Sequence, residues 1–464
     1  MKFRPTGRNL YTLFTGETIS SLLAFLVTLW LARRLTEEGF GLWAFVQSAI
    51  LYLVLLQDLG LSLYGMREIA RSRDLTPNLV VNIVAIRLLL GIGLAAVMIA
   101  LLPLTRMPAE LHILFLGGLL WLLPSALNLD FAFQGMERME GVAFWRILIH
   151  LLYLPLILVL VRERSDLVLV PFCRAAAGAG GVVVLYLYFR RFFRLHPLQN
   201  LNLNRGMGYL KVSIVMAASA IVIKLFYSFD TFMLGLLDRP AAVGWYQAAY
   251  KVVLFFIGLA SLIQTAFAPV FARESDNLGR PIYAFSALLL FLGSLCTFSL
   301  ILVSRPLVRL FYGTAYTPAG PALVLLSLSC LAVFCCTVFL APLLFGGRQK
   351  HYLAAIVLGA LVNIVLNLAL IPVWSYKGAA VATICSNLTM LLCGALYCRL
   401  WIDIKAVLGS IGATLALALG CFAAPILIFD LEWIRGFVFI VLFTTLYIAL
   451  FQRQRRAVLA LFKG

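Results

Sequence analysis

The chain has 464 residues, of which 63% are hydrophobic and only 12% are charged, and its formal net charge is +18. Soluble proteins have roughly 45–50% apolar and about 25% charged residues, so this composition excludes a soluble globular protein. The positive charge does not indicate nucleic-acid binding, because the basic residues lie in short segments between apolar runs. Such segments orient membrane proteins and meet anionic lipid. We therefore expect an integral membrane protein with the lipid bilayer, and no nucleic acid, as its partner.

Apolar stretches long enough to cross a bilayer recur along the chain. A spanning helix needs about 20 mostly apolar residues, and the runs are continuously apolar, which favours helices over a β-barrel. The first run carries Glu17 and ends without a small-residue cleavage site, so we interpret it as a span and not as a signal peptide. The sequence predicts about fourteen spans, at 10–32, 40–63, 79–104, 111–133, 142–161, 167–189, 208–236, 241–269, 282–304, 321–345, 352–372, 379–400, 406–429 and 433–451.

The basic residues between the spans predict the orientation of the protein. If the N-terminus is cytoplasmic, the even-numbered loops and the two termini hold 22 Lys and Arg residues, whereas the outer loops hold 10. Loops rich in Lys and Arg stay in the cytoplasm. We expect a multi-pass protein of the cell membrane with both termini in the cytoplasm.

A weak internal repeat relates two parts of the chain. The segment 41–47 (GLWAFVQ) opens the second span, and the segment 244–250 (GWYQAAY) opens the eighth. Because six spans separate them, the two halves have the same orientation and would form parallel repeats with a site between them. We predict an all-α membrane protein with two parallel six-helix lobes, 1–195 and 196–402, around a central cavity. Two additional helices and a basic cytoplasmic tail follow in 403–464.

Charged residues inside the spans are the first candidate functional residues, because each costs at least about 2.5–3.5 kcal/mol at the membrane centre. Glu17 lies about two turns into the first span, and Asp58 lies near the cytoplasmic end of the second. Glu17 is therefore the better candidate for binding a coupling ion. Arg87 and Arg174 are cations near the ends of their spans. Snorkelling or a structural ion pair is the alternative for each residue.

The seventh and eighth spans carry a second group of charged and polar residues. Lys224 and Asp230 lie in the seventh span, and Gln247, Tyr250 and Lys251 form a polar stripe in the eighth. Counted from the turn between the spans, Asp230 and Lys251 differ in depth by about one helical turn, so they could form an ion pair. Alternatively, Lys251 offers its charge to an anionic ligand.

Cations outnumber anions among these intramembrane residues, so a cavity between the lobes would be electropositive. Such a cavity suits a substrate that carries phosphate. The candidate substrate-binding residues are Arg33, Arg34, Arg87, Arg174, Lys224, Gln247, Tyr250 and Lys251. The candidate coupling-ion residues are Glu17, Asp58 and Asp230.

The eleventh and twelfth spans carry uncharged polar residues, for which we expect hydrogen bonds between helices, with contacts to sugar as the alternative. These residues are Asn363, Asn367, Thr383, Ser386 and Asn387. Neither a metal-ligand pattern of Cys and His nor a catalytic motif is found in the sequence. We expect a protein that is not an enzyme and that holds no metal.

Six segments resemble those of the polysaccharide flippase family, within the multidrug/oligosaccharidyl-lipid/polysaccharide exporter superfamily, and they follow spans one to twelve in order. The segments lie at 31–45 (LARRLTEEGFGLWAF), 58–61 with 65–71, 131–135 with 137–138, 230–235 with 243–251, 306–308 with 310–313, and 363–372 with 377–383. The resemblance implies that the protein moves undecaprenyl-diphosphate-linked oligosaccharide from the cytoplasmic to the outer leaflet by alternating access. It implies a cationic cavity, no cofactor, H⁺ or Na⁺ as a coupling ion, and polysaccharide polymerase machinery as a partner. Asp230 and Lys251 match the family's pattern in spans seven and eight.

Four other functions stay open at this point. A cation-coupled drug antiporter of the same superfamily would favour buried acids over buried bases, and a lipid II flippase would carry arginines deep in the first two spans. A membrane glycosyltransferase or polymerase would need a sizeable outer loop with catalytic acids. A structural role would leave the intramembrane charges unexplained. A flippase for lipid-linked oligosaccharide is therefore the leading hypothesis.

Overall fold

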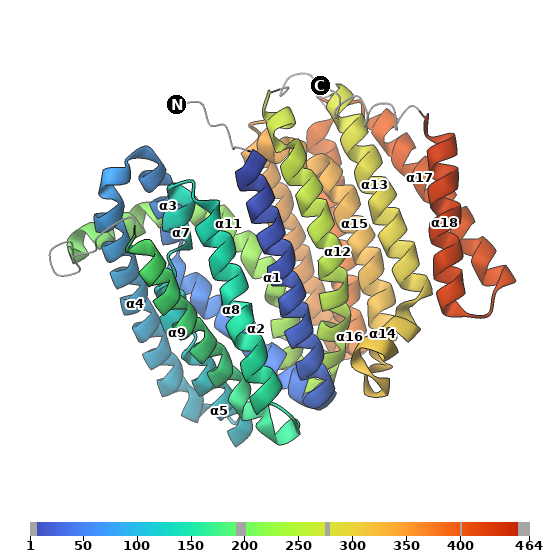
Figure 1. Ribbon diagram of the computed structural model, residues 1–464. Helices are drawn as coiled ribbons and strands as arrows, with labels where there is room; N and C mark the ends of the chain where they lie inside the picture. The colour runs from blue at the N-terminus through green and yellow to red at the C-terminus, as the bar shows by residue number, and fades with distance from the viewer. Residues whose placement is uncertain (1–6, 192–200, 274–278, 400, 453–464) are drawn as a thin grey trace. The chain divides into compact units, whose positions relative to one another are not determined.

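The computed structural model describes the backbone of residues 7–191, 201–273, 279–399 and 401–452. Within these ranges, the side chains of 7–14, 215–227, 273 and 279–280 lie outside the described part. Contacts divide the chain into two compact units, 1–232 and 233–464, and the ribbon in Figure 1 is helical throughout. The predicted lobe boundaries, after residues 195 and 402, stay predictions.

The first unit consists of helices joined by short turns. They are α1 (Gly7–Arg34), α2 (Thr36–Asp58), α3 (Leu61–Arg71), η1 (Arg73–Leu75), α4 (Thr76–Leu101), η2 (Leu102–Leu104), α5 (Ala109–Leu119), α6 (Leu122–Ala126), α7 (Asp130–Gly135), α8 (Met139–Leu160), η3 (Arg164–Leu169), α9 (Val170–Phe189) and the beginning of α11 (Leu203–Leu237).

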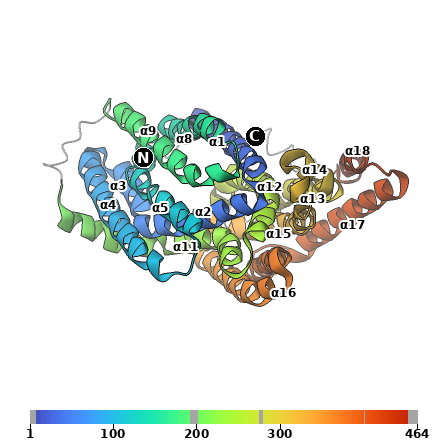
Figure 2. The same ribbon diagram turned by 90° about the horizontal axis from the view of Figure 1, so that it is seen from below.

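Close helix approach organises the first unit. Helix α8 packs along α1 on one side and along α9 on the other (Figure 2). Gly16 permits this approach in α1, because a Cβ atom at that position would collide with Ala143 of α8. Small residues allow such close packing in membranes, where neighbouring lipid is as apolar as the helices.

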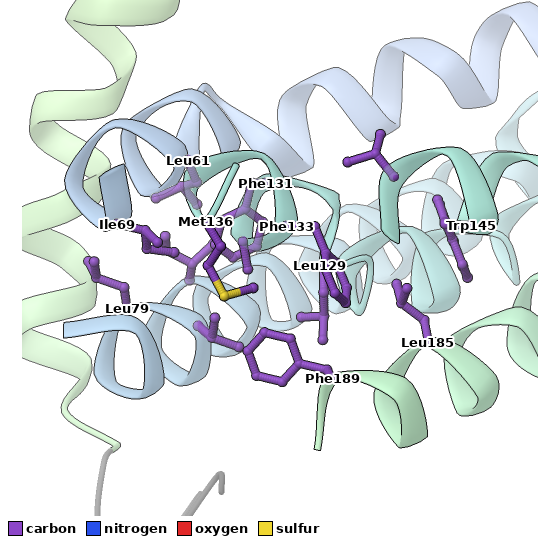
Figure 3. Close-up of a cluster of buried hydrophobic side chains, with 14 of the residues drawn as sticks. Leu61, Ile69, Leu79, Leu129, Phe131, Phe133, Met136, Trp145, Leu185 and Phe189 are labelled. Atoms are coloured by element: carbon purple, nitrogen blue, oxygen red, sulfur yellow. The ribbon is translucent and has the colours of Figure 1, made fainter. Parts of the chain in front are cut away.

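A cluster of buried apolar side chains joins α3, α4 and α7 to α8 and α9. Figure 3 shows Phe131, Phe133 and Met136 gathered against Leu61 of α3. Helix α3 approaches closely because residue 65 is glycine. A Cβ atom there would lie 2.6 Å from Ile83 Cδ1 and 2.7 Å from Phe131 Cδ2. The cluster therefore fixes the start of α7, which carries Asp130.

The fourth predicted span, 111–133, is divided into three helices. Helix α5 ends at Leu119, α6 holds Pro124, and α7 begins at Asp130. Proline lacks a backbone donor, and glycine destabilises a helix interior. Pro124 and the preceding Gly117–Gly118 pair give a physical reason for the interruptions.

The second unit is also helical throughout its described residues. It contains the end of α11, followed by α12 (Pro240–Arg273), α13 (Gly279–Leu302), α14 (Ser304–Tyr312), η4 (Thr314–Tyr316), α15 (Ala319–Phe345), α16 (Gln349–Cys398), α17 (Ile404–Ile428) and α18 (Glu432–Leu450).

Helix α16 contains two of the predicted spans, separated by a break at Ser375. The backbone of Ser375 adopts φ 54° and ψ −140°, far from helical values. The Ser375 hydroxyl donates a hydrogen bond to the Asp238 carboxylate. Just beyond the break, Gly378 is required because a Cβ atom would collide with the Leu370 carbonyl oxygen.

The last two helices, α17 and α18, pack with α13 (Figures 1 and 2). Aromatic rings fill this contact: Phe439 and Phe443 stack with centroids 5.5 Å apart, and Phe443 stacks on Phe291 of α13 at 5.7 Å. The Tyr447 hydroxyl donates a hydrogen bond of 3.0 Å to the Ala287 carbonyl oxygen. These rings and this bond anchor the C-terminal helices.

Twelve helical stretches of the described part, among them Ala109–Gly135 with its three helices, are long and apolar enough to cross a membrane. One of them, α16, covers two predicted spans, 352–372 and 379–400. The seventh predicted span, 208–236, falls in α11, which includes side chains outside the described residues. The prediction of an all-α membrane protein is confirmed. The cavity that we predict between the two halves stays a prediction.

Candidate functional site

Asp58 and Arg87, which the sequence proposes for different roles, form an ion pair. Arg87 Nε donates to Asp58 Oδ1 at 2.9 Å, and Nη2 donates to the same oxygen and to Ser62 Oγ. Arg87 Nη1 donates to the carbonyl oxygen of Asn128 at 3.1 Å. The Arg87 side chain is only 7% exposed. An ion pair is one of the two alternatives that the sequence leaves open for these residues, and their roles in binding substrate or ion stay predictions.

The turn between α2 and α3 positions Asp58. Leu59 and Gly60 have φ values of 39° and 82°, so the chain reverses immediately after α2 ends. Ser62 then donates to Asp58 Oδ1 through its backbone N–H at 3.2 Å and through its hydroxyl at 2.6 Å. Asp58 thereby caps the first turn of α3, as carboxylates do at helix N-termini.

Glu17, the preferred coupling-ion candidate, pairs with Arg146 of α8. The Ser20 hydroxyl donates to the Arg146 carbonyl oxygen at 3.2 Å, which adds a second link between α1 and α8. Glu17 is 51% exposed, so its carboxylate is partly accessible in spite of the pair. The pairing joins residues that are 129 positions apart, and only the packing of α1 on α8 brings them together.

Arg174 is a candidate cation whose charge is not neutralised by an acid within the described residues. Its Cζ atom lies 4.5 Å from the ring centroid of Trp121 and 5.9 Å from that of Trp43. A guanidinium over an indole face is held by cation–π attraction, which leaves its positive charge in place. Tyr153 interacts electrostatically with Arg174, and its buried hydroxyl has no hydrogen-bond partner in the described part of the chain. Arg174 therefore keeps its positive charge, and its role in binding substrate stays a prediction.

Arg33 and Arg34 are exposed at the turn between α1 and α2. Arg34 Cζ lies 4.6 Å from the ring of Trp30, whose Nε1 donates to the Val161 carbonyl oxygen at 2.8 Å. Close to the start of α2, Arg164 of η3 forms a bidentate pair with Glu110 of α5, with Nη2 3.0 Å from Oε2. The sequence did not single out this pair.

The candidates on α12 lie in the second unit. Gln247 is buried, whereas Tyr250 and Lys251 are half-buried. The Tyr250 ring stacks on Tyr246 with centroids 5.8 Å apart.

The remaining candidates lie on α11. Asp230 belongs to the first unit and is buried, and it interacts electrostatically with Tyr52 of α2. An ion pair of Asp230 with Lys251 would join the two units and stays a prediction. The side chain of Lys224 lies outside the described residues.

Two of the five polar candidates of α16, Ser386 and Asn387, form the hydrogen bonds between helices that the sequence predicts, whereas the Thr383 hydroxyl donates to Ala379 of its own helix. Ser386 Oγ donates to the Gly359 carbonyl oxygen at 2.7 Å, which joins the two parts of α16 on either side of Ser375. Asn387 Nδ2 donates to Ser329 Oγ of α15 at 3.1 Å. Both bonds are buried, and they join residues that are 27 and 58 positions apart in the sequence.

We expect Ser386→Ala to lower the free energy of unfolding by about 0.5–1.5 kcal/mol, because it leaves the Gly359 carbonyl oxygen without this donor. Unfolding in detergent micelles, followed by circular dichroism, measures the change. Thr389→Val is the matched control, because the Thr389 hydroxyl bonds only to Cys385 of its own helix turn. Equal losses in the two variants would contradict the structural role of the Ser386 bond.

Asp130, a residue inside the fourth predicted span, is not among the candidates selected from the sequence. Its side chain lies beside Asn128 and Arg87 and interacts with both. The signal was available, because a charge within a predicted span is the criterion that selected Glu17. What the sequence could not provide is its proximity to Arg87, which depends on the turn between α6 and α7.

The family described as "Polysaccharide biosynthesis protein" matches residues 6–275, more than half of the chain. The chain belongs to this family. A protein of Escherichia coli (strain K12), named "Putative O-antigen transporter", is 24% identical over 399 residues, which cover 82% of this chain and 93% of the relative.

Two solved structures are similar in fold to this chain. The lipid II flippase MurJ, in an inward closed conformation, has a TM-score of 0.75 at 14% identity, and the likeness covers 95% of this chain and 98% of that one. An inward-facing multidrug resistance MATE family transporter of the MOP superfamily has a TM-score of 0.62 at 17% identity, with 84% and 95% covered. The predicted family is confirmed, and the protein is a multi-pass membrane transporter.

Proposed function

We propose that the protein moves undecaprenyl-diphosphate-linked oligosaccharide units from the cytoplasmic to the outer leaflet of the cell membrane by alternating access. In this proposal both termini are cytoplasmic, H⁺ or Na⁺ drives the transport, and the polysaccharide polymerase machinery receives the cargo. The family match and the relative named for O-antigen transport support the substrate class.

The observation that carries the proposal is the charge of Arg174 in the first unit. Among the candidate acids of this unit, Glu17 and Asp58 are each paired with an arginine, and Asp230 is buried and interacts with Tyr52 of α2. Arg174 instead rests on two tryptophan rings and keeps its charge. A guanidinium of this kind binds phosphate oxygens in a planar, two-point geometry and repels a cationic drug. The charge of Arg174 therefore favours an anionic, phosphate-bearing cargo over the cation of a drug antiporter.

Transport in proteoliposomes tests the proposal and its alternatives together. The purified protein is reconstituted with one of three fluorescent probes: undecaprenyl-diphosphate oligosaccharide, lipid II, or a cationic dye. We expect an imposed proton or sodium gradient to move the oligosaccharide lipid between leaflets faster than in protein-free vesicles. Preferential transport of lipid II or of the dye would replace the proposal with that function. A change in the mass of the saccharide would indicate an enzyme.

Within this assay, we expect Lys251→Gln to slow translocation by about tenfold without reducing membrane insertion, which corresponds to about 1.4 kcal/mol of lost attraction. The reason is that a half-buried ammonium on α12 attracts the diphosphate. Lys405→Gln is the matched control, because Lys405 is exposed at the start of α17. Unchanged transport in Lys251→Gln would assign Lys251 to a structural pair.

A further inference from the structure

Asp130 carries a buried oxygen atom that has no hydrogen-bond partner in the described part of the chain. This atom is Oδ1, and it is shielded from solvent. The residues on either side, Leu129 and Phe131, belong to the apolar cluster of Figure 3 and are 4% and 2% exposed. A buried ionised carboxylate with an unpaired oxygen is costly, whereas a neutral carboxyl group in the same place costs far less. The surroundings of Oδ1 therefore favour a bound proton.

The charged group that acts on Asp130 is Arg87 of α4. Asn128 also interacts with the Asp130 carboxyl group, and its Oδ1 accepts the Asp130 backbone N–H at 2.9 Å. Helices α3 and α8, which also contact α7, present Gly65 and Gly141 to it at close range. Asp58 of α2 pairs with the same arginine. Two carboxyl groups thus interact with one guanidinium. The net charge of Asp58, Asp130 and Arg87 together is zero only when one of the two carboxyl groups holds a proton.

The hydrogen bonds of Arg87 indicate which of the two carboxyl groups holds the proton. A guanidinium has five N–H groups. Nε and Nη2 serve Asp58 and Ser62, and Nη1 serves the Asn128 carbonyl oxygen. One N–H of Nη1 has no acceptor among the described residues. In this structure Asp58 is the carboxyl group that pairs with the arginine, whereas Asp130 interacts with Arg87 only electrostatically.

We propose that Asp130 is a proton-binding residue of the first unit, protonated while Arg87 pairs with Asp58 and competing for Arg87 when it loses the proton. A proton fits this place better than Na⁺, because it needs one oxygen atom and not a shell of ligands. Withdrawal of Arg87 leaves Asp58 with its two bonds from Ser62 among the described residues. Proton binding itself does not depend on the cargo; its use as the coupling step of transport rests on the proposed function.

Infrared difference spectroscopy between acidic and alkaline pH tests the proton site directly in the full protein. A protonated carboxyl group in apolar surroundings gives a C=O stretching band apart from those of solvated acids. We expect one such band to disappear as pH rises, and we expect it to be absent at all pH values in Asp130→Asn. In Asp58→Asn, the released arginine should move the midpoint of the band to lower pH. Glu110→Gln, which removes a carboxylate paired elsewhere, should leave the band unchanged.

A band that persists in Asp130→Asn, or no pH-dependent band in the unmodified protein, would overturn the proposal. The absence of a pH-dependent band is tested in the unmodified protein, so the proposal can be contradicted even if Asp130→Asn does not fold. Transport of the oligosaccharide lipid is measured separately. If that transport is absent while the band behaves as expected, the proposed function fails and the proton site stands.

Discussion

Replacing Arg87 with glutamine is expected to lower the free energy of unfolding by about 3–5 kcal/mol, because removing one partner of a buried ion pair leaves the other charge uncompensated. The Arg87 side chain is 7% exposed and serves Asp58, Ser62 and Asn128 together, so one substitution disrupts contacts from three segments. Unfolding in detergent micelles, followed by tryptophan fluorescence, measures the loss.

A double variant separates the buried charge from the other contacts of Arg87. Arg87→Gln combined with Asp58→Asn should be less destabilised than Arg87→Gln alone, because no unpaired carboxylate remains. Arg71→Gln is the matched control: Arg71 is 60% exposed in its pair with Glu68, and such pairs contribute only about 0–1 kcal/mol. If Arg87→Gln lost no more stability than Arg71→Gln, the ion pair of Arg87 with Asp58 would not contribute to the free energy of unfolding.

Replacing Arg174 with glutamine is expected to weaken the apparent affinity for the diphosphate-linked oligosaccharide by about 10- to 100-fold. This range follows from about 1.5–3 kcal/mol for a hydrogen bond to a charged group. The folded structure should tolerate the change, because Arg174 lacks an acidic partner among the described residues and rests on the Trp121 and Trp43 rings. Initial transport rates at several lipid concentrations in proteoliposomes provide the measurement.

Arg164→Gln distinguishes a specific effect from a general loss of positive charge. Arg164 also lies in the first unit, but Glu110 neutralises it, so its replacement should change the apparent affinity little. The same loss of affinity in both variants would mean that only the total charge of the unit matters. That result would remove the argument for a phosphate contact at Arg174.

The sequence predicts the class of fold because the length of an apolar run reports directly on the thickness of the bilayer. It does not predict where a helix is interrupted within a run. The fourth span divides near Pro124, and α16 passes through a break at Ser375 that is stabilised by a bond to Asp238. Backbone groups at such breaks need partners from other segments, and a linear pattern does not show which segments are neighbours.

The same limit applies to the candidate site. A charge within a span is visible in the sequence, which is why Glu17, Asp58, Arg87 and Arg174 could be selected. Whether that charge is neutralised depends on the neighbouring helix: Glu17 and Asp58 have cationic partners, whereas Arg174 has aromatic ones. Asp130 is also a charge within a predicted span, but its proximity to Arg87 is visible only in the structure.

The contact of α17 and α18 with α13 bears on how this architecture can change in evolution. The two helices form a peripheral pair whose aromatic rings face α13, and the Tyr447 bond to Ala287 adds one polar link. In a bilayer, acyl chains can take the place of those rings at little energetic cost, because lipid is as apolar as the rings themselves. A gene could therefore lose this C-terminal hairpin, or acquire it, with changes confined to the face of α13 that the hairpin covers.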